Sequence, residues 1–172
     1  MGVAERLDQV DLHGLPATDA VRRLRPNLSP SAIRSAAARQ MALQYDDVGD
    51  LAASPGALEL LATVERLGLP WAIVTSADRR LAHARLQAAG IVAPAVLVTV
   101  EDVSAGKPDP EGFLLAARRL GIPPEQSLVV EDSASGIEAG RRAGALTATL
   151  RGLDGDIPIG GLSELAHRLA TA

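Results

Sequence analysis

The feature that most constrains the fold of this chain is the alternation of short apolar runs with helical patterns from about residue 55 onward. Apolar residues three and four positions apart, such as Leu60, Val64 and Leu67, indicate helices between the runs. Strands that alternate with helices at this spacing favour a mostly parallel sheet covered on both faces. We therefore expect a three-layer α/β fold. The expected strands are residues 71–75, 95–99, 127–131 and 145–150, and the expected helices are about 56–67, 78–89, 110–120, 136–143 and 163–170.

Residues 1–50 differ from the rest of the chain because they carry no strand signal. Two helices are expected there, over residues 18–24 and 29–41, and the second begins with the favourable pair Ser29–Pro30. The segment from Tyr45 to Asp50 is polar, and we expect it to be a solvated linker. The sequence thus predicts a helical unit over residues 1–50 and an α/β core over residues 51–172.

Composition argues against several classes of partner. The net charge is −4 and the basic residues form no stripe, so nucleic acid is not expected to bind. No apolar run approaches the roughly 20 residues of a membrane span, and the first residues contain no apolar signal region. The absence of cysteine excludes disulfides and thiolate chemistry. The default expectation is a cytoplasmic protein with no nucleic-acid and no membrane partner.

Polar side chains follow three of the expected strands, where ligands bind in open parallel sheets. Thr75 and Ser76 follow the first strand, and hydroxyls there can donate hydrogen bonds to an anion. Glu131 and Asp132 follow the third strand, where adjacent carboxylates favour a hard cation such as Mg²⁺. Taken alone, each pair also fits a simpler interpretation, namely an ordinary helix cap for the hydroxyls and a capping Asp with a solvated Glu for the carboxylates.

Lys107 follows the second strand and is the only lysine among 17 basic residues. Gly106 and Pro108 flank it, and the proline favours an extended conformation at the lysine. An ammonium held at the mouth of a sheet suits the neutralisation of a phosphoryl oxygen. The simpler interpretation is a surface lysine in a loop. The spacing is 32 residues from Thr75 to Lys107 and 25 from Lys107 to Asp132.

Three motifs resemble those of the haloacid dehalogenase superfamily. They are AIVTS ending at Ser76, GKPDPEGF around Lys107, and VVEDSASGIEAGRRAG from residue 129 to residue 144. The resemblance is to the branch with an early helical cap, which includes sugar-phosphate and polyol-phosphate phosphatases and β-phosphoglucomutase. Residues 13–24 are similar to the HG-containing segment of such caps. The resemblance implies a Rossmann-like three-layer core preceded by a partial N-terminal helical cap.

The resemblance also implies a role for each matching residue. Thr75 corresponds to the hydroxyl that binds the phosphoryl group, with Ser76 beside it. Lys107 corresponds to the lysine that steadies the nucleophile and the transferring phosphoryl group. Asp132 corresponds to the ligand of Mg²⁺, the implied cofactor, and Glu131 lies next to it in the surroundings of the metal.

One part of the family pattern is missing from this sequence. Members begin with a strand that carries a D-x-D motif, whose first Asp attacks phosphorus and whose second acts as general acid and base. The nearest match has Asp11 as a degenerate nucleophile and His13 in place of the second Asp, but no apolar strand precedes it. We therefore expect a core that lacks its first strand and its nucleophile.

The missing strand has a structural consequence. In the family it lies between the strands that end at Thr75 and Glu131, so its loss would expose two apolar strand edges. Either those strands pair directly, or another chain fills the gap, or the chain begins too late. Exposed edges also allow self-association.

The expected function is Mg²⁺-dependent hydrolysis of small phosphorylated sugars or polyols, incomplete or inactive in this chain alone. One alternative is a non-catalytic protein that binds a phosphorylated ligand or a partner protein through Thr75, Lys107 and Asp132. Another is a phosphomutase. The expected ligand in each enzyme reading is a small phosphorylated metabolite, and the partial cap leaves its identity open.

Overall fold

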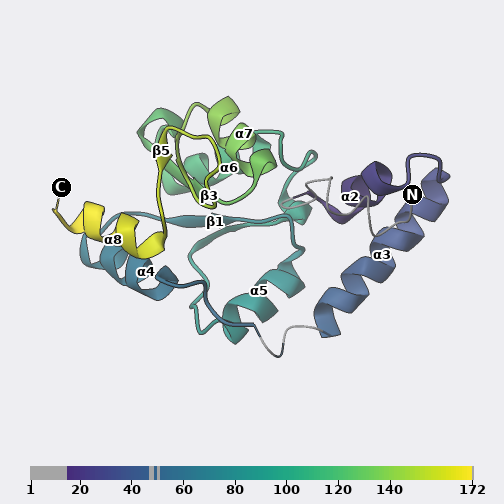
Figure 1. Ribbon diagram of the computed structural model, residues 1–172, viewed down its shortest axis with the longest axis horizontal. Coiled ribbons are helices and arrows are strands. Elements are labelled where there is room, and N and C mark those ends of the chain that lie inside the picture. Colours follow the sequence, from purple (N-terminus) through teal and green to yellow (C-terminus); the bar gives the residue numbers. More distant parts are fainter. Residues whose placement is uncertain (1–14, 47–48, 50, 172) are drawn as a thin grey trace.

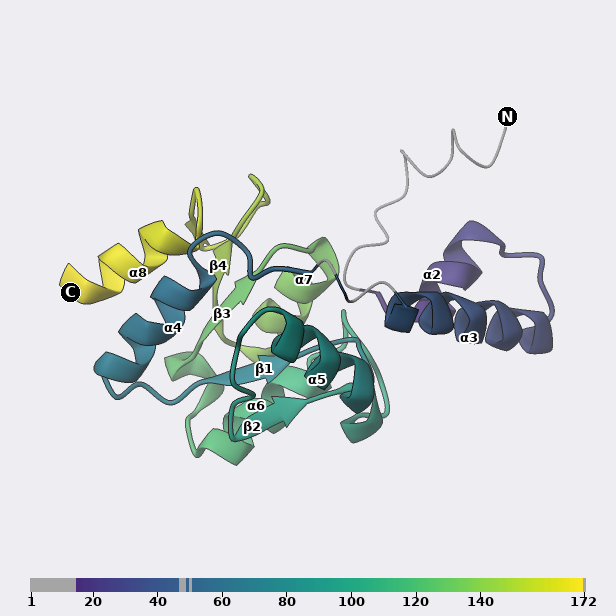
Figure 2. The same ribbon diagram turned by 90° about the horizontal axis from the view of Figure 1, so that it is seen from below.

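A computed structural model describes residues 15–46, 49 and 51–171 of the chain. In these residues an α/β core is preceded by two helices, α2 and α3, that extend away from it (Figures 1 and 2). The helices are α2 (Ala17–Leu24), α3 (Pro30–Asp46), α4 (Ala57–Arg66), α5 (Arg79–Ala88), α6 (Glu111–Leu120), α7 (Ala134–Ala143) and α8 (Leu162–Thr171). The strands are β1 (Ala72–Val74), β2 (Val96–Val98), β3 (Leu128–Glu131), β4 (Leu146–Thr149) and β5 (Ile157–Pro158), and 3₁₀ turns lie at Val100–Asp102 and Pro124–Gln126.

The strands form two separate parallel sheets. β1 pairs with β2, with Ile73 opposite Leu97. The other sheet has the order β3-β4-β5, with Val129 opposite Thr147. β1 and β3 are therefore edge strands of different sheets, so the expected alternative in which they pair directly is not what the structure shows.

Helices cover both faces of the sheets and make the expected three layers (Figure 1). On one face α6 packs on β1 and β2, and α7 packs on β3 and β4. On the other face α5 packs on β1 and β2 through Leu81 and Leu97. There α4 and α8 pack together, and Leu60 of α4 and Leu165 of α8 belong to one cluster with Ala148 of β4. Each expected strand and helix is present, with its ends shifted by a few residues. The α/β fold class is thus confirmed.

Small residues allow the close packing of α7 on its sheet. A Cβ at Gly140 would lie 3.1 Å from atoms of both Val129 and Thr147. The core is built mostly from Ala, Val, Leu and Ile because the chain contains one Phe, one Tyr and one Trp. Small side chains bring the layers close together.

The helices before the core pack on one another through Val21, Ile33 and Ala37. One expectation fails here: Tyr45 does not lie in a solvated linker, because α3 continues to Asp46. The ring of Tyr45 packs against the cluster that contains Leu81, and its hydroxyl donates to Asp78. The division of the chain at residue 50 stays a prediction. Among the described residues, no helix combines the length and apolarity needed to cross a membrane.

Candidate phosphate site at the carboxyl ends of the strands

Lys107 joins the carboxyl ends of the two sheets. Its Nζ donates to the carbonyl oxygen of Val74 on β1 at 3.2 Å and forms an ion pair with Glu131 on β3. The side chains of Lys107 and Glu131 are only 11% and 9% exposed, so the pair is shielded from bulk water. The ammonium also lies 5.1 Å from the ring centre of Phe113, within the range of a cation–π contact. The lysine is therefore held in place and is not a free surface side chain.

Glu131 is held from its other side by the first turn of α7. Ser133 Oγ donates to Glu131 Oε2 at 3.0 Å and accepts from the backbone N–H of Gly136 at 3.1 Å. A Cβ at Gly136 would lie 2.1 Å from the carboxyl carbon of Glu131, which no real contact allows. The carboxylate thus occupies space that only glycine leaves open. Sequence reasoning did not single out Gly136, although a glycine in the first turn of a helix was a visible signal.

Thr75 and Ser76 lie directly after β1, as expected. The backbone N–H of Thr75 continues the ladder by donating to Val98 O at 2.9 Å. Its Oγ1 accepts from the backbone N–H of Ala77 at 3.1 Å, which is a local turn interaction and not a helix cap, because Asp78 caps α5. That hydroxyl keeps its own proton to donate. Since Lys107 contacts the carbonyl of the preceding residue, Val74, the structure brings Thr75 and Lys107 to the same end of β1.

Asp132 follows β3 and points to a different environment from Glu131. Its carboxylate is 43% exposed and lies 4.0 Å from Nη1 of Arg151. No group of three metal-ligating side chains occurs among the described residues. Mg²⁺ commonly uses only one or two protein carboxylates and fills the remaining positions with water and phosphate oxygens. Asp132 fits one such position, whereas both oxygens of Glu131 already accept hydrogen bonds.

A cavity of about 540 Å³ lies beside Lys107, between the core and α2. Lys107 and Pro108 lie on the core side with the start of α7, which includes Glu138. Arg22 and Arg23 lie on the side of α2, where Arg22 is ion-paired with Asp19. The two arginines were not singled out from the sequence, because nothing in the spacing along the chain places them near Lys107. The cavity has the size of a site for a small metabolite.

The N-terminus of α2 lies against the loop that carries Lys107. A Cβ at Gly106 would lie 2.5 Å from Cγ of Pro16. Gly106 therefore allows α2 to approach the residue next to the lysine.

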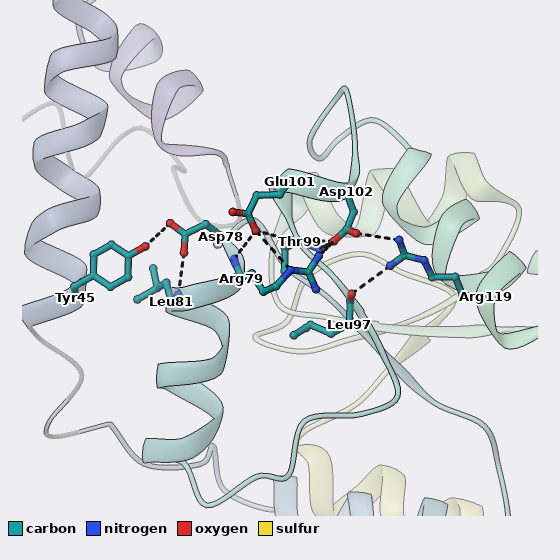
Figure 3. A network of polar contacts seen from close by, with 9 residues as sticks. All are labelled: Tyr45, Asp78, Arg79, Leu81, Leu97, Thr99, Glu101, Asp102 and Arg119. Atoms are coloured by element: carbon teal, nitrogen blue, oxygen red, sulfur yellow. Dashed lines mark hydrogen bonds and ion pairs between the residues drawn. The ribbon is translucent and has the colours of Figure 1, made fainter.

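A polar network braces the start of the same loop (Figure 3). Asp102 accepts from the backbone N–H and the hydroxyl of Thr99, from Arg79 and from Arg119, each at 2.9 Å. These bonds, first among them the one from the Thr99 backbone N–H, hold the pKa of Asp102 well below its usual range. Arg79 also forms an ion pair with Glu101, at 3.8 Å. The network is a support of the loop, away from the cavity.

A second cavity, of about 590 Å³, lies between β1 and β3. Side chains of both strands line it, together with apolar residues of α4, α6 and α8. It lies where the two sheets fail to join. Asp11, the degenerate nucleophile suggested by the sequence, is outside the described residues, and so is His13.

The comparison with known proteins agrees with the three motifs. A family model for haloacid dehalogenase-like hydrolases matches residues 13–144. Hexitol phosphatase A of Escherichia coli is 38% identical over 77% of this chain and 62% of its own length. Validoxylamine A 7'-phosphate phosphatase of Streptomyces hygroscopicus is 37% identical over 77% of this chain and 69% of its own length. The chain thus spans less than two thirds of the first of these relatives.

Solved structures show the same fold. A hydrolase from Pseudomonas syringae is 32% identical, with a TM-score of 0.74, over 89% of this chain and 70% of that one. β-Phosphoglucomutase from Clostridium difficile is 17% identical, with a TM-score of 0.82, over 93% of this chain and 77% of that one, and this likeness concerns the fold alone. With the fold, the motifs and the family model in agreement, this chain belongs to the haloacid dehalogenase-like hydrolase family.

Proposed function

We propose that this chain carries the phosphate-binding and Mg²⁺-binding part of a phosphohydrolase that acts on small phosphorylated sugars or polyols. The observation that carries the proposal is the position of Lys107, which is held between the ends of β1 and β3 in the wall of a metabolite-sized cavity. Curated relatives named as hexitol and validoxylamine phosphate phosphatases support the class of substrate.

The proposed roles follow from the chemistry of each side chain. The Lys107 ammonium neutralises charge on a phosphoryl oxygen, and the Thr75 hydroxyl and the neighbouring Ser76 donate to the same group. Asp132 holds Mg²⁺ together with phosphate and water, and Glu131 positions Lys107 from behind. When bound, Mg²⁺ would neutralise phosphate charge and act as a Lewis acid. Arg22 and Arg23 line the substrate cavity on the side of α2.

The nucleophile is the part of the proposal that the described residues do not supply. The carboxylate nearest to Lys107 among them is Glu131, and both of its oxygens are bonded to Lys107 and Ser133. We therefore propose that the described residues bind a phosphorylated ligand without completing hydrolysis. This arrangement also favours the alternative of a non-catalytic phospholigand-binding protein. The phosphomutase reading and the cytoplasmic location stay predictions.

The test measures binding and turnover in the same preparations. Purified chain is titrated calorimetrically with inorganic phosphate, with and without Mg²⁺, and is then assayed with p-nitrophenyl phosphate and a panel of sugar and polyol phosphates. The variants are Lys107→Ala and Asp132→Ala, with Asp154→Ala as the control because that carboxylate is 93% exposed. Circular dichroism confirms that each variant is folded.

Each outcome is informative. Mg²⁺-dependent phosphate binding that is lost in both site variants, without turnover, supports the proposal. Turnover that both variants abolish would mean that the chain contains a nucleophile, with Asp11 as the first candidate. The proposal of ligand binding without hydrolysis would then be wrong. Phosphate binding that is absent, or equal in all variants, would reject the site itself.

A further inference from the structure

Asp132, the proposed Mg²⁺ ligand, has a positively charged neighbour in the structure. Its Oδ2 lies 4.0 Å from Nη1 of Arg151, and the side chains of Asp132 and Arg151 are 43% and 63% exposed. An N–H···O hydrogen bond is rarely longer than about 3.2 Å, so this contact is an ion pair without a direct hydrogen bond. The guanidinium therefore lies beside the same carboxylate that a metal cation would need.

The register of the strands places Arg151 at this position. Thr149, the last residue of β4, lies opposite Glu131, the last residue of β3. Leu150 N–H continues this ladder by donating to Glu131 O at 3.0 Å. Because the strands are parallel, the residues that follow them come to the same edge of the sheet. Arg151 thus leaves β4 where Asp132 leaves β3.

The backbone at Arg151 has a conformation that arginine seldom adopts. Its φ is +60°, and among the described residues it is the one non-glycine residue with a positive φ. Gly152 follows with a φ of +70°, and Leu153 N–H donates to Leu150 O at 3.2 Å, so residues 150–153 form a tight turn with two consecutive left-handed residues. Glycine and asparagine are the residues favoured at such positions, so local backbone preference does not explain an arginine here.

Contacts next to the turn hold it in this shape. The buried hydroxyl of Thr149 donates to Leu153 O at 2.8 Å. A Cβ at Gly155 would lie 2.1 Å from Cγ2 of Thr149, so the chain packs directly on that side chain just after the turn. Strained backbone persists where the surrounding structure imposes it, and it is concentrated at functional sites. The turn therefore holds the backbone of Arg151 in one place at the edge of the candidate site.

We propose that Arg151 is a counter-ion of Asp132 that competes with Mg²⁺ and so sets the affinity of the metal site. The inference rests on the proposed role of Asp132 as a Mg²⁺ ligand, and it adds a residue that lies outside the three motifs. Without metal, the guanidinium offsets the charge of the carboxylate. Arg151 must move away from Asp132 before the carboxylate can coordinate a cation, and its 63% exposed side chain has solvent to move into. Because the pair is exposed, its effect is modest and is screened by salt.

The experiment measures metal affinity directly and requires no turnover. Mn²⁺ is the probe because it prefers the same oxygen ligands as Mg²⁺. It is titrated into the purified chain at low salt and again at about 0.5 M salt, where exposed charges are strongly screened. Electron paramagnetic resonance measures the free Mn²⁺, and Mg²⁺ is then added as the competitor.

The variants separate charge from geometry. Arg151→Gln removes the charge, Arg151→Lys keeps it, and Asp132→Ala shows whether the measured ion binds at the proposed site. Arg141→Gln is the matched control, because it removes one arginine charge from a pair with Asp154, whose side chain is 93% exposed. Circular dichroism confirms that each variant is folded.

We expect Arg151→Gln to bind Mn²⁺ about three- to tenfold more tightly than wild type at low salt, because both the competing ion pair and the repulsion between the two cations are removed. The difference should shrink at high salt. Arg151→Lys and Arg141→Gln should bind Mn²⁺ with nearly the affinity of wild type, and Asp132→Ala should lose the binding.

The outcomes that contradict the inference differ from those that contradict the metal site. Equal Mn²⁺ affinities of wild type and Arg151→Gln, with binding lost in Asp132→Ala, would overturn the inference and leave the metal site intact. Tighter binding that is independent of salt, or that Arg151→Lys shows equally, would also overturn it, because the cause would then be steric. Absence of Mn²⁺ binding in every protein, or binding that Asp132→Ala leaves unchanged, would reject the metal role of Asp132 and the inference with it.

Discussion

The position of Glu131 depends on the absence of a side chain at Gly136. The carboxylate fills the space where a Cβ would lie, 2.1 Å from its carboxyl carbon. Gly136→Ala should therefore displace Glu131 from Lys107 and lower the free energy of unfolding by about 1–3 kcal/mol, as overpacking does. Urea unfolding followed by circular dichroism measures this change. Gly161→Ala is the control, because no atom lies within 4 Å of a Cβ there. Equal effects of the two substitutions would contradict the steric argument.

Asp102 gives a prediction about pH. Its pKa is lowered in the folded protein, first by the Thr99 backbone N–H and then by Arg119, whereas an unfolded Asp titrates near about 3.9. The contribution of the ionised Asp102 carboxylate to the stability of the fold is therefore complete above that value. It is lost as the pH falls through the lower pKa of the folded state. Asp102→Asn should lower the melting temperature at neutral pH, and the difference from wild type should shrink progressively below about pH 4.

The matched control for this prediction is Asp154→Asn. Asp154 forms one ion pair, with Arg141, and its side chain is 93% exposed, so its loss should change little at any pH. A difference between wild type and Asp102→Asn that stays constant from neutral to acid pH would show that the effect is steric. The melting temperatures of wild type, Asp102→Asn and Asp154→Asn across this pH range decide between an electrostatic and a steric effect.

Single residues show where sequence reasoning reaches its limit. Thr75, Lys107 and Glu131 could be placed together because the carboxyl ends of parallel strands share one edge of a sheet. Arg22 and Arg23 could not be placed near Lys107 from the sequence, because their distance from it depends on how α2 lies against the loop at Gly106. That packing is a contact between segments far apart in sequence, and no local pattern encodes it.

At the scale of elements, α3 is attached to the core through the first turn of α5. Asp78 accepts from Leu81 N–H at 2.8 Å as the N-cap of α5 and also from the Tyr45 hydroxyl. Asp78→Ala should remove both interactions and cost about 1 kcal/mol through the lost cap alone. Tyr45→Phe should leave the cap intact and speed amide hydrogen exchange only in the last turns of α3. Hydrogen exchange with mass spectrometry separates the two effects.

The matched variant for this pair is Asp78→Ser, which keeps a side-chain cap and shortens the reach toward Tyr45. It should resemble Tyr45→Phe in the exchange of α3 and wild type in the exchange of α5. Exchange of α3 that is unchanged in all three variants would mean that apolar packing of Tyr45 and Met41 on α5, rather than the hydrogen bond, holds the helix.

Elements with a strong local signal were predictable, and elements defined by tertiary contacts were not. The helix that becomes α5 had Asp78 as a visible cap, and the structure has that cap. β5 has only Ile157 and Pro158, and it exists as a strand because Ile157 pairs with Ala148 of β4. The sequence at the C-terminal end of α3 predicts a polar linker. The end is helical because Tyr45 contacts α5, which lies far from it in the sequence.

At the scale of the whole molecule, no strand ladder joins the two sheets in the described part of the chain, and the Lys107–Glu131 ion pair links β3 to the end of β1. Both side chains are largely buried. Removing one member of a buried ion pair leaves the other charge without compensation, which typically lowers stability by about 3–5 kcal/mol. Replacing both members can restore much of the loss.

A double-mutant cycle on this pair tests whether it holds the two sheets together. Lys107→Met keeps the length of the stem, so it should lower the free energy of unfolding by about 3 kcal/mol and speed amide exchange at the ends of β1 and β3. Glu131→Gln is made alone, to complete the cycle, and in the Lys107→Met background, where it removes the uncompensated charge and should recover part of that loss. Urea unfolding gives the coupling energy, and strictly additive losses would show that the sheets are joined by helix packing instead. Because β1 and β3 share no ladder, a large coupling would identify one side-chain pair as the bond across the gap.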